Sequence, residues 1–366
     1  MAYVDVEDAA HLLSRNYPAG MPLQQVIPFR TQQRQQVSAI PNMGRLLRGM
    51  MVRTSRVLLG RSLQSPLEAS MDLSEQGAES NGPVPSADDG GLRAALRAMW
   101  ASVAPSWCEL AEHVDTREAV VTQAMLDSAG LRRGHRVLEL ACGPGGVGMA
   151  AAAVVGPDGA VVLSDVVPEM TAIAADRAKS AGLTNVTTRE VDLERIDYPD
   201  SAFDAVLCRE GLMLVLDTAS AAREARRILR LGGRAVFTVW GPRDRNPWLG
   251  LLLDAVIAET GLPVPPPGIP WPFSLEAPGA LAELLAGAGF RGTEVREIPT
   301  PMKVSTLDEW WSMVPSLAGP LARVLRSLPA ETSAAIRARA DAALADFSSL
   351  DGYELPGVCL LGVGGR

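Results

Sequence analysis

The stretch Arg136–Met149 constrains the fold more than any other part of this 366-residue chain. A short apolar run from Val137 to Leu140 carries one acid, Glu139, and a cluster of glycines follows it (Gly143, Gly145, Gly146, Gly148). Small and apolar residues that favour a helix come next. This order predicts a buried strand, a tight loop and a helix. Glycines let such a loop adopt positive φ and let a ligand reach the backbone, and the unpaired N–H groups at the helix start suit a carboxylate or a phosphate.

Two cofactors use loops of this kind. The spacing Gly143-x-Gly145-x-x-Gly148 fits a dinucleotide fingerprint, which alone is a weak signal. Glu139 favours the second candidate, S-adenosylmethionine, because a buried strand rarely carries an uncompensated acid. The ammonium group and the oxygen-rich ribose of that cofactor would give this acid a role. The alternative is that Glu139 caps a local amide.

A second acid lies at the end of the next predicted strand. Ala160–Ser164 reads as the next strand, and Asp165 closes it. An acid at this strand end can accept both hydroxyls of a ribose. Asp165 therefore indicates an adenosine ligand, without choosing between the two cofactors.

These residues resemble the first motifs of the class I S-adenosylmethionine-dependent methyltransferases. Glu139-Leu-Ala-Cys-Gly-Pro-Gly145 fits the family's loop, with Ala141 where the family often has glycine. The resemblance runs from about Trp107 to Val363, and within the family it is nearest to the quinone-biosynthesis type and its small-molecule relatives. It implies that S-adenosylmethionine is the cofactor. The residues implied to bind it are Glu139, Ala141, Gly143, Gly145, Asp165, Val166, Met170, Asp192, Leu193 and Arg209. For Asp192, capping of the following turn is an alternative role.

The predicted fold is α/β, with a doubly wound, mostly parallel, seven-stranded Rossmann-like sheet. Helix, glycine pair Gly232-Gly233 and a strand over Arg234–Trp240 follow in the family's order. The last two strands are expected at Thr293–Ile298 and Gly357–Val363. Residues 305–356 between them are longer than the family's usual connection and largely helical in pattern. We call them the lid segment, since we expect them to form a helical lid.

Residues 1–91 differ in composition from the rest. Arg15 to Arg61 contains arginines and no acid, whereas residues 68–89 are acidic and rich in Ser, Gly and Pro. A basic amphipathic helix near Leu46–Leu59 would suit an anionic membrane surface. The interpretation we prefer is a poorly ordered extension and linker, which leaves 92–366 as the methyltransferase domain.

The composition and the motifs of the chain argue against several classes of partner. A net charge of −8 argues against nucleic acid, and the segment after the fourth strand lacks the motifs of base-methylating enzymes. The four cysteines have no paired spacing, so no metal site is expected. No membrane span or secretory signal is predicted, so we expect a cytoplasmic protein. The sequence leaves the oligomeric state open.

The predicted function is methyl transfer to a small, largely apolar acceptor, at oxygen or carbon, by in-line displacement. Glu210 is the candidate base, and an ion pair with Arg209 is its alternative role. Trp107, Trp240, Trp248, Trp271 and Phe273 are candidate walls of an apolar or aromatic substrate site. Two other functions remain: an NAD(P)-dependent oxidoreductase using the same loop, and a non-catalytic protein that binds S-adenosylmethionine.

Overall fold

The structure is a computed structural model that describes residues 87–265, 268–277 and 279–366. The predictions made for residues 1–86, including the basic helix, lie outside the described residues. Asn81–Arg366 forms one compact unit. Its first described helix, α4 (Ala87–Ala101), begins before the expected Leu92.

A seven-stranded sheet forms the centre of the unit, in the order β3-β2-β1-β4-β5-β10-β6. The strand β10 runs antiparallel to both of its neighbours, and the pairs from β3 to β5 are parallel. The predicted doubly wound, mostly parallel sheet is therefore confirmed. The strands are β1 (Arg136–Glu139), β2 (Ala160–Asp165), β3 (Val186–Glu190), β4 (Phe203–Arg209), β5 (Leu229–Trp240), β6 (Arg291–Pro299) and β10 (Val358–Gly365).

The apolar runs of the sequence form the middle of this sheet. Val137 and Leu138 in β1, and Val206 and Leu207 in β4, have no exposed surface. Such strands are buried on both faces, which is why their sequences are continuously apolar rather than alternating. The outer strands β3 and β6 are mostly exposed and carry charged residues.

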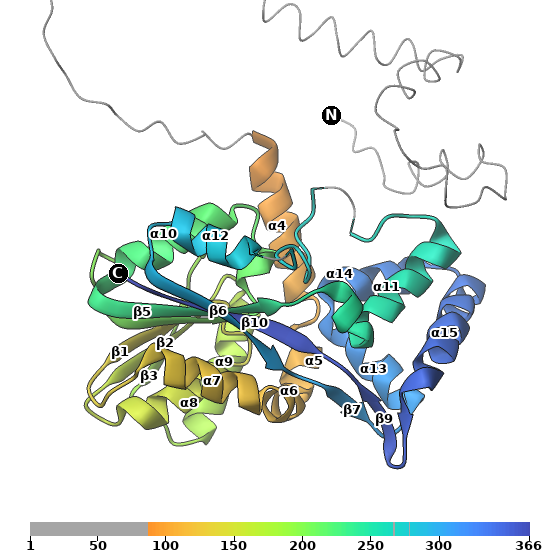
Figure 1. Ribbon diagram of the computed structural model, residues 1–366, viewed down its shortest axis with the longest axis horizontal. Helices are drawn as coiled ribbons and strands as arrows, with labels where there is room; N and C mark the ends of the chain where they lie inside the picture. Colours follow the sequence, from red (N-terminus) through yellow and green to blue (C-terminus); the bar gives the residue numbers. More distant parts are fainter. Residues whose placement is uncertain (1–86, 266–267, 278) are drawn as a thin grey trace, which may run out of the picture. The chain divides into compact units, whose positions relative to one another are not determined.

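Helices cover both faces of the sheet. One face carries α7 (Ala119–Ala129), α8 (Gly146–Val155) and α9 (Pro168–Ser180), and the other carries α10 (Thr218–Ile228) and α12 (Ala280–Gly287) (Figure 1). Small and apolar side chains face the strands, as in α8, where Val147, Ala151 and Val155 are buried. This layering puts the carboxyl ends of the parallel strands at one edge of the sheet.

Two elements differ from the sequence prediction. The strand β5 starts at Leu229, so Gly232 and Gly233 lie within it rather than before it. Gly232 has a φ of 79°, and a Cβ on Gly233 would lie 2.8 Å from the backbone oxygen of Asp204. The pairing of β4 with β5 shifts register here, so the glycines mark an irregular strand. The sequence pattern also predicts one helix over Thr116–Ser128, but Glu118 separates α6 (Ala111–Arg117) from α7 there.

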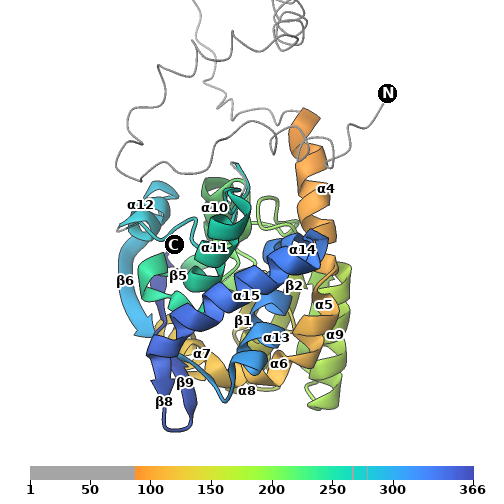
Figure 2. The same cartoon turned by 90° about the vertical axis from the view of Figure 1, so that its right-hand side faces the viewer.

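The lid segment contains three helices, as its pattern indicated, and it contributes two strands to a small sheet that the pattern did not indicate. The helices α13 (Leu307–Leu317), α14 (Gly319–Ser327) and α15 (Ala330–Leu344) lie beyond one end of the main sheet (Figures 1 and 2). Next to them, β7 (Met302–Val304), β8 (Ser348–Ser349) and β9 (Gly352–Leu355) pair in the order β7-β9-β8.

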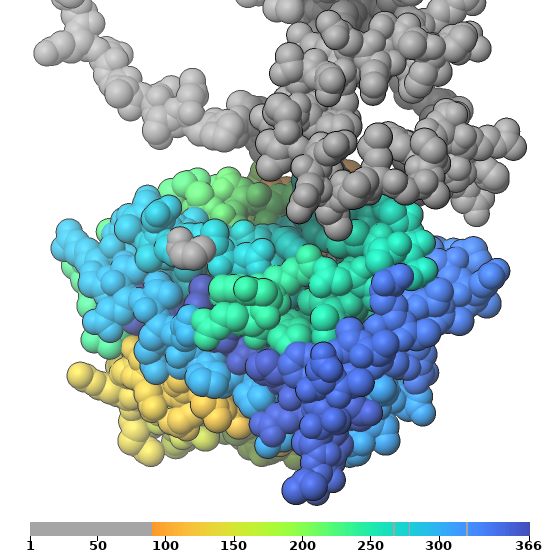
Figure 3. Space-filling view, turned by 45° about the vertical axis from the view of Figure 1, so that its right-hand side comes forward, coloured from red at the N-terminus to blue at the C-terminus, as the bar shows by residue number. Residues whose placement is uncertain are grey.

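The helix α11 (Pro247–Thr260), which follows β5, packs against α15. The space-filling view shows these two parts of the chain in contact at the surface (Figure 3). Within the residues that the structure describes, no helix combines the length and the apolar character that crossing a bilayer requires.

Candidate active site

A cavity of about 300 Å³ lies at the carboxyl ends of the parallel strands. The segments that follow β1, β2, β4 and β5 form one side of it, and residues of α4, α6, α13 and α14 form the other. Ligands of open α/β sheets bind in this position. The candidate base Glu210 and all of the predicted cofactor residues except Gly145 line the cavity.

Gly145 contributes to packing in this structure. It precedes α8 with a φ of 85°, and a Cβ there would lie 2.8 Å from Cδ1 of Leu163 and 3.1 Å from Cβ of Ala174. The absence of a side chain lets α8 and α9 approach β2. Gly143, two residues earlier, also has a positive φ of 49° and does line the cavity.

Glu139 is buried at the end of β1. Its Oε2 accepts a hydrogen bond of 2.8 Å from the backbone N–H of Gly148, so it does cap a local amide. The side chain also lines the cavity and is 2% exposed. Burial, more than any neighbouring charge, raises the pKa of this carboxyl to about 8, and the charge of Arg209 opposes that rise.

Asp165 holds the loop from the next strand. Its Oδ2 accepts from the N–H of Gly143 and its Oδ1 from the N–H of Val167, both at 3.0 Å. Burial raises the pKa of Asp165, and these backbone hydrogen bonds act against that rise. The carboxylate is thus fixed by the same loop that lines the cavity, and each of its oxygens keeps a lone pair for a further donor.

Apolar side chains lie beside these two acids. Val166, Met170 and Leu193 line the cavity, and a second hydrophobic cluster joins Val167 and Met170 to Trp107 of α5 (Ala104–Glu109). Asp192 lines the same region, and its Oδ1 accepts from the N–H of Glu194 at 2.9 Å. The turn-capping role weighed for Asp192 is therefore present, together with its place at the cavity.

Ala141 has a backbone conformation that non-glycine residues seldom adopt. Its φ is 48°, and its side chain packs against Gly211, where a Cβ would lie 2.4 Å away. The glycine that the resembling family often has at this position would adopt this conformation without strain.

Arg209 ends the fourth strand, Glu210 follows it, and both line the cavity. Nη1 of Arg209 donates to Oγ1 of Thr122 at 3.0 Å, and its Nη2 lies 3.6 Å from Oδ1 of Asp115. Its ion-pair partner is thus Asp115, and not Glu210 as in the alternative role weighed for that residue. Glu210 has a φ of 56°, and its Oε1 is enclosed without a hydrogen bond in the described part of the chain. Burial, together with the charge of Glu118, raises the pKa of Glu210 to about 8.

Residues 131–245 match a family model described as a methyltransferase domain. The chain carries a methyltransferase domain. The matched residues include β1 to β5 and the glycine loop, which are the elements that carry the predicted cofactor residues.

Curated proteins that are similar to this part of the chain are also named as methyltransferases. The chain is 36% identical over 110 residues to the ubiquinone/menaquinone biosynthesis C-methyltransferase UbiE of Pasteurella multocida, and the match covers 30% of this chain and 41% of that protein. The chain is 35% identical over 130 residues to the UbiE of Ectopseudomonas mendocina, and this match covers 35% of this chain and 50% of that protein. The chain thus spans about half the length of the curated relatives it matches. The solved structure of YcgJ from Bacillus subtilis is 20% identical, with a TM-score of 0.46, and covers 67% of this chain and 98% of that one. The family match and these relatives support the expected resemblance to class I methyltransferases of the quinone-biosynthesis type.

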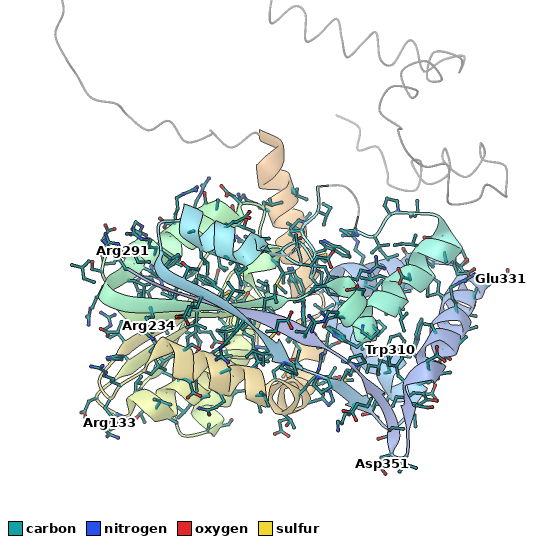
Figure 4. All side chains as sticks on the ribbon, viewed as in Figure 1. Arg133, Arg234, Arg291, Trp310, Glu331 and Asp351 are labelled. Atoms are coloured by element: carbon teal, nitrogen blue, oxygen red, sulfur yellow. The ribbon has the colours of Figure 1, made fainter. Side chains whose placement is uncertain are left out.

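The aromatic residues predicted for the substrate site divide into two groups. Trp107, Trp240, Trp248 and Trp271 line the cavity. Phe273 is buried outside it. Trp310 is fully buried among the lid helices, and its Nε1 donates to the backbone oxygen of Trp248 at 2.9 Å (Figure 4). It therefore belongs to the packing that joins the lid segment to α11.

The sequence did not single out Arg117 and Glu118 as site residues, and both line the cavity. They lie at the division between α6 and α7, which the helical pattern did not reveal. His113, which the sequence could not orient, lines the cavity as well. A pair of charges in an otherwise amphipathic helix was the available signal, but such pairs are common on exposed faces.

Proposed function

We propose that this protein transfers a methyl group from S-adenosylmethionine to a small, largely apolar acceptor, at oxygen or carbon. One observation carries the proposal: a single cavity connects the glycine loop and its two buried carboxylates to an aromatic compartment that contains Glu210. The relatives named as ubiquinone/menaquinone biosynthesis C-methyltransferases support the same reaction type.

The side chains present suit the cofactor. Glu139 and Asp165 offer carboxylates for an ammonium group and a diol, and Val166 and Met170 offer apolar surface for a flat ring. In the proposal, Glu139, Ala141 and Gly143 hold the amino-acid end, Asp165 the ribose, and Asp192 and Leu193 the edge of the base. When bound, the cofactor supplies an electrophilic methyl group on a sulfonium.

The remaining task of the protein is alignment. In-line displacement requires the acceptor atom to lie about 3 Å from the methyl carbon and opposite the leaving sulfur. We propose that Trp240 and Trp248 orient a flat acceptor, while α13 and α14 of the lid segment keep water out. Glu210 then removes the acceptor's proton. The proposal includes a cytoplasmic location and an aromatic or otherwise hydrophobic acceptor.

Two measurements test the proposal. Titration calorimetry with S-adenosylmethionine, S-adenosylhomocysteine and NAD should show binding of the first two only. A screen with methyl-labelled S-adenosylmethionine over phenols, hydroquinones and lipids should then find a labelled product. Binding of NAD in preference would favour the oxidoreductase, and binding without transfer to any acceptor would favour a non-catalytic role.

A further inference from the structure

A second set of buried ionisable groups lies beside Glu210 in the cavity. Arg117, Glu118 and His113 line it together with Glu210. Oε2 of Glu118, Oε1 of Glu210 and Nε2 of His113 are enclosed, yet none of them makes a hydrogen bond within the described residues. Buried polar atoms almost always have partners, so three unpaired atoms at one cavity need an explanation.

Glu118 is held firmly. It is 2% exposed, and its backbone ends α6 and begins α7. Its Oε1 accepts from Oγ1 of Thr300 at 3.1 Å and lies 3.6 Å from Nε of Arg117. One carboxyl oxygen is therefore fixed by the protein, and the other is left for a different donor.

Arg117 is fixed from the aromatic side. Its guanidinium carbon lies 4.3 Å from the ring centre of Trp248 and 5.2 Å from that of Trp240, and Nη2 donates to the backbone oxygen of Thr300. Burial lowers the pKa of this guanidinium, although Glu118 and Glu210 both act to raise it. The two tryptophans that face the cavity thus also place one positive charge beside the two carboxyls.

Two cations lie near this pair, and both also contact other groups. Nη2 of Arg209 lies 3.6 Å from Oδ1 of Asp115, and Arg117 contacts both Glu118 and the backbone oxygen of Thr300. Two carboxyls that interact in a low dielectric do not both ionise readily. The high pKa of Glu210 agrees with this. After burial, the charge of Glu118 does most to raise that pKa, while the charges of Arg209 and Arg117 act to lower it. His113 and the buried thiol of Cys359 are the other titratable groups here.

We infer that Glu118 and Glu210 form a carboxyl pair that shares one proton and receives the weakly acidic hydroxyl of an acceptor with a flat apolar ring. This inference rests on the proposed function and adds Glu118, as a positioning residue, to the acceptor end of the site. The ring would lie against Trp240 and Trp248, with Met313 and Val314 of the lid segment also on the cavity wall.

The step balances for transfer to the hydroxyl oxygen. The acceptor's O–H bond breaks and its proton goes to the ionised carboxylate of the pair. The oxygen's electron pair forms the bond to the methyl carbon, and the sulfur keeps the pair of the bond that breaks. The sulfonium charge and the carboxylate charge are lost together, so the buried cluster gains no net charge.

The first test reads the pair directly, without an acceptor. Infrared spectra of the full chain, loaded with S-adenosylhomocysteine, should show a protonated carboxyl band that disappears as the pH rises through about 8. Difference spectra against Glu210→Gln separate this band from that of Glu139. In Glu118→Gln the midpoint should fall by about one pH unit or more, because a neighbouring negative charge is removed. A purely structural Glu118 would leave the midpoint in place, and that result, or the absence of the band, would overturn the inference.

The second test uses 2-naphthol as the hydroxyl probe and 2-methylnaphthalene as its counterpart without a hydroxyl. On the loaded protein, Glu118→Gln and Glu210→Gln should each weaken 2-naphthol binding about tenfold, the scale of one hydrogen bond to a charged group. Binding of 2-methylnaphthalene should not change. Glu112→Gln, an exposed glutamate on the same helix, is the matched control. Equal 2-naphthol binding in all proteins, or none in the wild type, would contradict the inference, whereas failure to bind S-adenosylhomocysteine would refute the proposed function itself.

Discussion

Glu139 and Asp165 each combine a structural contact with a place at the cavity. Both accept backbone N–H groups of the glycine loop, and both are buried. The two roles, loop anchor and cofactor ligand, are compatible because each carboxylate oxygen can accept more than one donor. A change of either acid must therefore be measured for binding and for stability.

Glu139→Gln and Asp165→Asn should each weaken S-adenosylhomocysteine binding by about 1–3 kcal/mol, the scale of a lost hydrogen bond to a charged group. Titration calorimetry measures the change, and thermal unfolding shows whether the fold survives. Glu190→Gln is the control, since Glu190 is exposed and pairs with Asp165 across β2 and β3. Unchanged affinity in both variants would remove these acids from the cofactor site.

The pKa of Glu210 also predicts how stability depends on pH. The pKa of about 8 in the fold exceeds the ordinary 4.5, so the native protein binds this proton more tightly than the unfolded chain. The resulting stabilisation is complete below pH 4.5 and is lost as the pH rises to about 8. Its upper limit is about 5 kcal/mol, at about 1.4 kcal/mol per pH unit.

Urea unfolding at pH 5 and pH 8 measures this effect. The wild type should lose more stability over that interval than Glu210→Gln, whose amide cannot ionise. Glu139→Gln should also lose less stability than the wild type over this interval, because the pKa of Glu139 is also about 8. Equal losses in the wild type and Glu210→Gln would show that Glu210 is ionised throughout.

For single residues, the sequence predicted a place at the cavity where the residue ends or follows a recognisable strand. Glu139, Asp165 and Glu210 were located at the cavity because each ends or follows a strand of a parallel sheet. Glu118 was not, because its importance comes from Thr300, 182 positions away, and from Arg117, which is held by Trp240 at the end of β5 and Trp248 in α11. No local pattern contains such a contact.

The loop between β1 and α8 shows how glycines serve two purposes within one element. Gly143 lies at the cavity with a positive φ, whereas Gly145 lets α8 and α9 approach Leu163. The shared motif thus contains one residue placed for a ligand and one placed for packing. Alanine substitutions should separate the two effects.

Gly145→Ala should destabilise the protein by more than Gly134→Ala. Both glycines have a similar positive φ, but the added Cβ meets Leu163 at 2.8 Å in the first and nothing within 4 Å in the second. The backbone strain common to both costs about 1–2 kcal/mol, and the overpacking at Gly145 adds about 1–3 kcal/mol. Urea unfolding of the two variants gives the difference, and equal losses would contradict the close approach.

The main elements were largely predictable, and the exceptions have identifiable causes. Gly130 and Gly156 follow the ends of α7 and α8, yet Gly232-Gly233 stands inside β5, where a register shift uses the flexible backbone. The small sheet next to the lid helices was missed because β8 has two residues and β7 three, too few for an alternating pattern. These strands depend on pairing with β9 rather than on their own sequence.

At the scale of the whole molecule, the compact unit Asn81–Arg366 contains all residues that line the cavity. A chain that lacks residues 1–80 should therefore fold and bind S-adenosylhomocysteine with the affinity of the full chain. A chain that lacks residues 1–101 should bind more weakly, because α4 contributes Leu96, Arg97 and Trp100 to the cavity wall. Calorimetry on both truncations checks this, and weak binding by the first would give residues 1–80 a role in the site.

The position of β10 between β5 and β6 has a consequence for how the protein is made. Translation delivers β6 well before β10, with the entire lid segment in between. Until then β6 has no neighbour to join, while the strands that carry the glycine loop can already assemble. In a ribosome-bound intermediate, the strands around the glycine loop would thus be paired while the edge of β5 is still open. This is the stage at which we expect a chaperone to bind.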